Sequence, residues 1–182
     1  QGEAEGLVKP IFVGNEEEIK RVLEAEGATG DYEILHADSL EDCARIWVTQ
    51  VSSGKAELIL KGHIDTSILL KAVVNKEYGI GTGQTITHMA FQEVDSYHKI
   101  FVITDGGVIP YPSLEQKEAI IRTNVETLRR MGWEEPKVAV VCAIEKVNPG
   151  MAETVEAGKL KEMNQAGEIE NCIVEGPISF DL

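Results

Sequence analysis

The sequence has few of the features that mark secreted, membrane-bound or metal-binding proteins. Its cysteines, Cys43, Cys142 and Cys172, form no CxxC pair, which argues against a disulfide framework or a zinc site. Cys142 and Cys172 lie inside apolar segments and are expected in the core. The longest apolar run, residues 138–144, is far shorter than the roughly 18 residues of a membrane span. No signal-peptide pattern stands near the start, so the cytoplasm is the expected location.

Positive charge is also scarce. The 182 residues include 17 Lys+Arg and 31 Asp+Glu, which gives a formal net charge of −14 and a pI near 4.7. Nucleic-acid binding depends on clustered Lys and Arg, and the sequence has no such cluster. We therefore expect neither a nucleic acid nor a membrane as partner. Of the histidines, which show no metal-ligand spacing, only His63 at a predicted strand end is a candidate site residue.

Strand-like and helix-like segments alternate along the chain. Strands are predicted at residues 9–13, 32–37, 56–60, 85–94, 99–104, 137–144 and 169–174. Helices are predicted at residues 15–27, 39–54, 65–76, 113–131 and 152–166. The polar turn at 95–98 predicts a hairpin, and the helices between the other strands predict parallel crossovers. The fold class is therefore α/β with a mixed, mostly parallel sheet, and a lobe boundary is expected near residues 79–83.

Polar and small residues follow four of the predicted strands. Because ligands of open α/β sheets bind beyond the carboxyl ends of strands, these segments are the first place to look for a site. They are residues 61–67, 105–107, 145–149 and 175–177. Their small residues let a ligand approach the backbone closely.

The segment 61–67, Lys-Gly-His-Ile-Asp-Thr-Ser, is the most informative of the four. Asp65, Thr66 and Ser67 stand where a helix begins, and the free N–H groups of a helix N-terminus bind anions. Lys71 follows Ser67 by one turn on the same face. This pattern predicts a phosphate cradle, and the alternative is an ordinary N-cap beside a solvated lysine.

Other motifs leave two interpretations open or exclude a function. Asp105 before Gly106-Gly107 is either a site carboxylate beside flexible backbone or a turn residue. Asn148-Pro149 is interpreted as a turn before it is interpreted as a site. The glycines at 79–83 follow a helix and lead into a strand, the reverse of the dinucleotide-binding order, so that function is excluded.

Several strings of this sequence resemble the phosphate acetyl/butyryltransferase family, and its butyryl branch in particular. These strings are residues 61–67, 69–77, 87–88, 101–107, 114–117, 135–139, 147–151 and 175–181. They run in family order over nearly the whole chain. The resemblance implies a three-layer α/β/α fold similar to isocitrate and isopropylmalate dehydrogenases, with two lobes around a cleft, assembled as a homodimer or larger homo-oligomer.

The resemblance also implies an activity. Phosphotransacylases of this family are acyltransferases that convert acyl-CoA and phosphate into acyl phosphate and CoA, here with a butyryl or branched short acyl group. Neither a metal nor any cofactor besides these substrates is implied. Two alternatives stay open: a phosphate acyltransferase that takes long acyl chains from acyl carrier protein, and a noncatalytic module that binds phosphate or acyl phosphate.

Site residues follow from the same resemblance. Contacts to phosphate or acyl phosphate are expected from Lys61, Gly62, His63, Thr66, Ser67, Lys71, Thr87, His88, Asp105, Gly106 and Gly107. Other positions in the cleft are expected for Asn148, Pro149 and Asp181. Gly106 stands where acetyl-specific members have a cysteine, so no thiol role is expected there.

Family members extend beyond both ends of this sequence. They have another strand–helix unit before the equivalent of Gly6 and a long segment after the equivalent of Leu182. The Ser, Arg and carboxylate implied to handle CoA belong to that later segment, so no catalytic residue is assigned here. We therefore expect residues 1–182 to form a partial acyltransferase domain that lacks the CoA half of the site when isolated.

Overall fold

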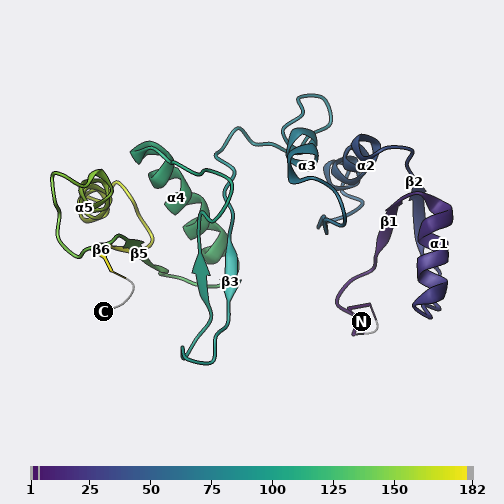
Figure 1. The fold of residues 1–182 in the computed structure, drawn as a ribbon, viewed down its shortest axis with the longest axis horizontal. Coiled ribbons are helices and arrows are strands. Elements are labelled where there is room, and N and C mark those ends of the chain that lie inside the picture. The colour runs from purple at the N-terminus through teal and green to yellow at the C-terminus, as the bar shows by residue number, and fades with distance from the viewer. Residues whose placement is uncertain (1, 4, 180–182) are drawn as a thin grey trace. The chain divides into compact units, whose positions relative to one another are not determined.

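A computed structural model describes residues 2, 3 and 5–179 of the chain. Its elements are β1 (Ile11–Gly14), α1 (Glu16–Ala25), β2 (Glu33–His36), α2 (Leu40–Ser52), α3 (Thr66–Val73), β3 (Ala90–Gln92), β4 (Phe101–Ile103), α4 (Leu114–Arg130), β5 (Lys137–Val141), α5 (Ala152–Gln165) and β6 (Ile173–Ile178) (Figure 1). The chain divides into two compact units, Gln1–Gly83 (unit 1) and Gln84–Leu182 (unit 2).

Unit 1 begins with a β-α-β arrangement. β1 and β2 pair in parallel, with Gly14 opposite His36, and α1 packs against both strands. The Asn15 side chain caps α1 by accepting a hydrogen bond from the N–H of Glu18 at 3.0 Å. Ser39 caps α2 in the same way through the N–H of Asp42 at 3.1 Å. These caps fix where the two helices begin at the carboxyl ends of the strands.

The second half of unit 1 is a helix pair. α2 and α3 pack around a core of four buried side chains, Ala44, Val48, Ile64 and Ala72. After α3 the chain turns tightly at Gly79, where a Cβ would lie 2.2 Å from the carbonyl oxygen of Asn75. Only glycine fits this turn, which explains one of the glycines at 79–83 without a ligand.

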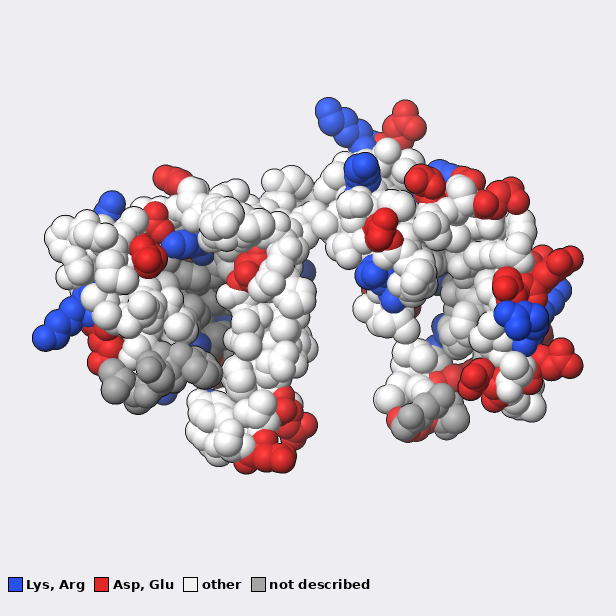
Figure 2. Space-filling model, in the orientation of Figure 1, with Lys and Arg blue, Asp and Glu red and all other residues white. Residues whose placement is uncertain are grey.

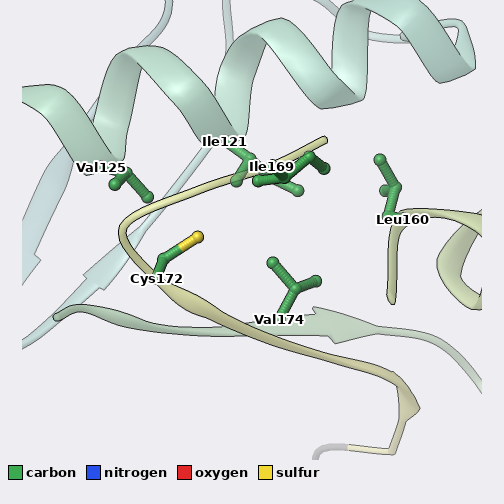
Figure 3. Close-up of a cluster of buried hydrophobic side chains, with 6 residues drawn as sticks. All are labelled: Ile121, Val125, Leu160, Ile169, Cys172 and Val174. Atoms are coloured by element: carbon green, nitrogen blue, oxygen red, sulfur yellow. The ribbon is translucent and has the colours of Figure 1, made fainter. Parts of the chain in front are cut away.

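Unit 2 holds an antiparallel and a parallel strand pair. β3 and β4 form the predicted hairpin, and β5 and β6 pair in parallel beside α5. The core of the unit packs α4 and α5 side chains against the segment that leads into β6 (Figure 3). It consists of Ile121, Val125, Leu160, Ile169, Cys172 and Val174. The core thus fixes α4, α5 and the β5–β6 pair as one unit.

The sequence predicts one mixed sheet, and this prediction is wrong because the strands of the described residues do not join into a single sheet. In the described part of the chain, the strands form three separate two-stranded sheets, two parallel and one antiparallel. The predicted strand at 56–60 is absent from the described residues. Leu58 is 72% exposed and Leu60 is 87% exposed, and Ile59 between them packs against the core of α2 and α3.

Two further strands differ from their predicted bounds. The predicted strand 85–94 shortens to the three residues of β3. The last strand starts later than predicted because Asn171 has φ 65°, which interrupts an extended backbone. β6 then continues to Ile178, so residues 175–177 lie inside a strand and not after its end.

The surface carries both signs of charge. On the face shown in Figure 2, Lys and Arg lie scattered among more numerous Asp and Glu. On α1, for example, Lys20 pairs with Glu16 and Arg21 with Glu18. Within the described residues, no helix has the length and apolar character needed to cross a membrane.

Candidate functional site

The N-terminus of α3 begins the candidate site in unit 1. Asp65 is the N-cap residue with an extended backbone, φ −63° and ψ 133°, but its side chain makes no capping hydrogen bond. Asn15, Ser39 and Ser113 all cap their helices with side chains. The first-turn N–H groups at Thr66 and Ser67 therefore keep their hydrogen-bonding capacity for an anion.

Two lysines accompany this helix start. The Lys61 ammonium donates a hydrogen bond to the carbonyl of Ile64 at 2.7 Å, which holds its charge just before the helix. Lys71 is exposed in the last turn of α3 and makes no ion pair or hydrogen bond with a described residue. Its position one turn after Ser67 matches the sequence prediction.

The remaining predicted residues of this segment line a neighbouring cavity. Gly62 and His63 are exposed and, together with buried Ile64, border a cavity of about 450 Å³ in unit 1. The opposite side of the cavity is formed by the carboxyl ends of β1 and β2 and the start of α2. One segment of unit 1 thus carries all the predicted residues of this part of the site, Lys61, Gly62, His63, Thr66, Ser67 and Lys71.

In unit 2, Thr87 belongs to a polar cluster around the buried Asn124. Its hydroxyl lies 3.0 Å from the Thr104 hydroxyl and accepts a hydrogen bond from the Asn124 amide at 3.3 Å. The same amide donates to the carbonyl of Ile120 at 2.9 Å. Asn124 is only 5% exposed, and its Oδ1 has no partner among the described residues.

Sequence reasoning missed Asn124. The signal was present, because this polar residue stands on the apolar face of the α4 sequence, four residues after Ile120 and next to Val125. A polar residue in that position requires a buried hydrogen-bond partner. What the sequence could not give was the partner, since Thr87 is 37 residues away.

Asp105 acts as a backbone clamp. One carboxylate oxygen accepts from the N–H of His88 and the other from the N–H of Ile109, each at 2.9 Å. The His88 ring lies against Gly106, where a Cβ would come within 3.4 Å of the ring nitrogen Nδ1. Of the two interpretations left open by the sequence, this geometry favours the turn, because both oxygens of Asp105 already serve the fold. It still brings His88, Asp105 and Gly106 together, with Gly107 following in the chain.

Asn148 organises the turn before α5. Its carbonyl accepts from the N–H of Met151 at 2.8 Å, and its side chain accepts from the N–H of Gly150 at 2.9 Å. The Thr154 hydroxyl accepts from the N–H of Asn148 at 2.9 Å. Pro149 is exposed within this turn. Asp181 lies outside the described residues.

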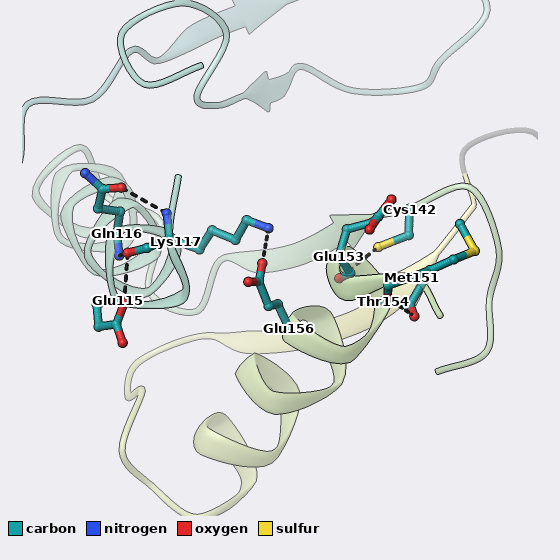
Figure 4. A network of polar contacts seen from close by, with 9 residues as sticks. Glu115, Gln116, Lys117, Cys142, Met151, Glu153, Thr154 and Glu156 are labelled. Carbon is teal, nitrogen blue, oxygen red and sulfur yellow. Dashed lines mark hydrogen bonds and ion pairs between the residues drawn. The ribbon is translucent and has the colours of Figure 1, made fainter. Parts of the chain in front are cut away.

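The polar contacts between α4 and α5 are structural in character. Figure 4 shows Lys117 of α4 reaching Glu156 of α5, with 2.5 Å between Nζ and Oε2. Nearby, the Cys142 thiol points to the Glu153 carbonyl at 3.5 Å. Burial raises the pKa of Cys142 and Cys172, which disfavours the thiolate form. These buried cysteines confirm the prediction of core residues.

The described residues offer no metal-binding cluster. Across residues 2, 3 and 5–179, no three His, Cys, Asp or Glu side chains gather in a way that could hold a metal ion. The candidate site of unit 1 relies on N–H groups and ammonium groups, which bind anions.

The profile of the phosphate acetyl/butaryl transferase family matches residues 14–182. The chain belongs to this family. The match includes every residue predicted for the site, from Lys61 to Asp181, and confirms the resemblance drawn from the sequence strings.

Individual relatives agree with this assignment. A phosphate butyryltransferase of Clostridium acetobutylicum is 35% identical over 97% of this chain and 59% of its own length. A phosphate acetyltransferase of Thermotoga maritima is 38% identical over 97% of this chain and 60% of its own length. The chain thus spans about three-fifths of the length of these relatives.

Solved structures show the same fold. A branched-chain phosphotransacylase from Enterococcus faecalis superposes with a TM-score of 0.74 at 23% identity, covering 94% of this chain and 70% of the other. A phosphotransacetylase from Staphylococcus aureus gives a TM-score of 0.69 at 18% identity, covering 98% and 63%. The α/β class with small, mostly parallel sheets is therefore confirmed.

Proposed function

We propose that this protein is a phosphate acyltransferase that moves a butyryl or branched short acyl group between CoA and inorganic phosphate. The observation that carries the proposal is the start of α3, where Thr66 and Ser67 offer free N–H groups in a segment that also carries Lys61 and Lys71. The family membership of the chain gives this anion site its chemistry. The butyryl assignment is supported by the 35% identity to the Clostridium phosphate butyryltransferase.

The proposed reaction is one acyl transfer. An oxygen of bound phosphate attacks the carbonyl carbon of the acyl thioester and forms a tetrahedral oxyanion. The carbon–sulfur bond then breaks, the sulfur leaves with the bonding electron pair as CoA thiolate, and acyl phosphate remains. Phosphate, oxyanion and thiolate are all negatively charged, so the site must supply N–H donors and cations at fixed positions.

Unit 1 supplies the phosphate part of these requirements. The helix N-terminus provides N–H groups with a partial positive charge, and Lys71 adds a full charge on the same face. Lys61, held by the Ile64 carbonyl, keeps further ammonium protons available for phosphate. Gly62, His63, Thr87, His88, Asp105, Gly106 and Gly107 remain proposed contacts to phosphate or acyl phosphate.

The proposal extends to fold and assembly. It includes a three-layer fold of the isocitrate/isopropylmalate dehydrogenase type, with two lobes whose boundary lies near residues 79–83. It also includes a homodimer or larger homo-oligomer in the cytoplasm, with acyl-CoA, CoA and phosphate as substrates and no further cofactor. Asn148, Pro149 and Asp181 are proposed to lie elsewhere in the cleft.

The test is loss of the thioester absorbance of butyryl-CoA on adding the purified chain with phosphate or arsenate. Arsenate gives an acyl product that hydrolyses and pulls the reaction forward. In protein that includes the CoA half of the site, we expect anion-dependent loss that falls about tenfold in Lys71→Ala at limiting anion and is retained in Lys76→Ala. Saturable phosphate binding without thioester loss would instead select the noncatalytic binding module.

A further inference from the structure

A cavity of unit 1 lies beside the candidate phosphate site. It measures about 450 Å³, within the range of small-molecule sites. It opens at the carboxyl ends of β1 and β2, the position where α/β proteins bind ligands. All of its lining residues belong to unit 1, so the unit forms it alone.

The walls of the cavity are mainly apolar. Val13, Leu40, Cys43, Trp47 and Ile64 all contribute to its lining. Cys43 and Ile64 are buried, whereas Leu40 is 46% exposed although it stands in the first turn of α2. A half-exposed leucine and a tryptophan on a cavity wall provide apolar surface that a ligand can cover.

The polar groups that line the cavity disfavour binding of an anion. Asn15 and Ser39 are occupied as helix caps, and the Asp38 carboxylate accepts a hydrogen bond from His36 at 3.0 Å. The lining contains the carboxylate of Asp38 and the imidazole of His63 but neither Lys nor Arg, so the several phosphates of CoA are disfavoured. Mainly apolar walls with a single carboxylate favour an uncharged apolar group.

The cavity and the phosphate site share one segment of chain. Ile64 lines the cavity, and Thr66 begins α3 two residues later, a span of roughly 7 Å at most. The cavity wall and the anion-binding start of α3 are therefore parts of the same short segment of chain. Phosphate attack on a thioester requires proximity between the acyl carbon and the anion.

We propose that this cavity receives the acyl chain of the thioester, with Leu40 and Trp47 as its walls. The proposal rests on the proposed function, and it names the part of the substrate that unit 1 recognises besides phosphate. It follows that the cavity takes a short neutral acyl chain and rejects the charged end of CoA.

The test uses the S-butyryl thioester of N-acetylcysteamine, a neutral probe without the CoA phosphates. In the full chain with Trp133→Phe, Trp47 is the single tryptophan. We expect a saturable change in its fluorescence with the butyryl probe. Leu40→Ala in this background should raise the apparent Kd about fivefold through lost apolar contact. Leu58→Ala removes a leucine that is also exposed but lies outside the cavity lining, and it should leave the Kd unchanged.

The outcomes separate this proposal from the proposed function. Acyl transfer with no Trp47 response, or with equal Kd values in Leu40→Ala and Leu58→Ala, would overturn the acyl cavity and leave the enzyme intact. A saturable Trp47 response without acyl transfer would support the cavity and count against the enzyme. A response to adenosine and none to the butyryl probe would overturn the proposal in favour of a nucleoside site.

Discussion

Lys61 and Lys71 lie near the same helix but differ in the hydrogen bonding of their ammonium groups. Lys61 is tied to the Ile64 carbonyl at 2.7 Å, whereas Lys71 has no partner among the described residues. A tied ammonium contributes to the local fold as well as to the site. An untied exposed lysine contributes little to folding, so its substitution tests ligand binding with small risk to the structure.

The first prediction concerns Lys71. Lys71→Ala should weaken phosphate binding about tenfold, because a charge-assisted hydrogen bond is lost. Isothermal titration with phosphate measures this directly. Lys71→Arg should retain most of the affinity, and Lys76→Ala, another exposed lysine past the end of α3, should match the parent. An unchanged phosphate Kd in Lys71→Ala would remove this residue from the site.

The second prediction concerns the buried Asn124. Asn124→Leu removes an unpaired buried acceptor together with a donor and should change the free energy of unfolding by less than about 1 kcal/mol. Asn124→Asp should lower the free energy of unfolding by about 3 kcal/mol at pH 7. It buries a carboxylate at a place where Oδ1 of Asn124 finds no hydrogen-bond donor.

The pH dependence of the aspartate variant has a defined sign. Burial raises the pKa of a carboxyl group in the folded state above its unfolded value, so the neutral acid is favoured in the fold. The stability deficit relative to Asn124→Leu should therefore shrink as pH falls toward the unfolded pKa of Asp, near 4. Urea unfolding of both variants at pH 5 and pH 7 tests this. A deficit that is the same at both pH values would contradict it.

At the scale of elements, local signals identified helices better than strands. Asn15, Ser39 and Ser113 were predicted as helix starts and all three cap their helices in the structure. Helix starts depend on residues within one turn, which the sequence shows directly. The start of α3 at Thr66 could be predicted for the same reason, because it is a local feature.

Strands and the unit 2 contacts depend on distant partners. The apolar segment 56–60 was predicted as a strand, but no strand of the described residues pairs with it and Leu60 is 87% exposed. The clamp formed by Asp105 also needs His88, which is 17 residues away. Such pairings are set by the tertiary fold, and hydrophobic pattern alone does not contain them.

The third prediction tests the cap of the longest helix. Ser113 and Gln116 form a capping box at the start of α4, with reciprocal hydrogen bonds at 3.3 Å and 2.9 Å. Ser113→Ala should cost about 1 kcal/mol and lower the Tm by about 2–4 °C. Thermal unfolding followed by circular dichroism measures the shift. Ser96→Ala, in an exposed turn, is the control, and equal Tm values for the two variants would contradict the cap.

At the scale of the molecule, the formal net charge of −14 sets the response to salt. Unit charges of one sign repel in the compact state, and salt screens that repulsion. The ion pairs that salt also weakens are mostly exposed, as for Arg21 with Glu18, and contribute little. The loss of repulsion should therefore dominate.

The fourth prediction follows from this balance. Raising NaCl from about 20 mM to about 500 mM should increase the Tm by a few degrees. At the higher concentration the Debye length is about 4 Å, and repulsion between charges farther apart than this is largely screened. Differential scanning calorimetry at constant pH measures it. A Tm that falls with NaCl would mean that the ion pairs outweigh the net charge.

The measurement that tests the account most directly is phosphorus NMR of the chain with butyryl-CoA and phosphate. Acyl transfer predicts a new acyl phosphate resonance that grows in step with free CoA thiol, and a slower growth in Lys71→Ala at limiting phosphate. Release of CoA with no acyl phosphate would identify thioester hydrolysis and contradict the account. Unchanged spectra, with phosphate bound at the start of α3, would contradict the transferase and leave a phosphate-binding protein.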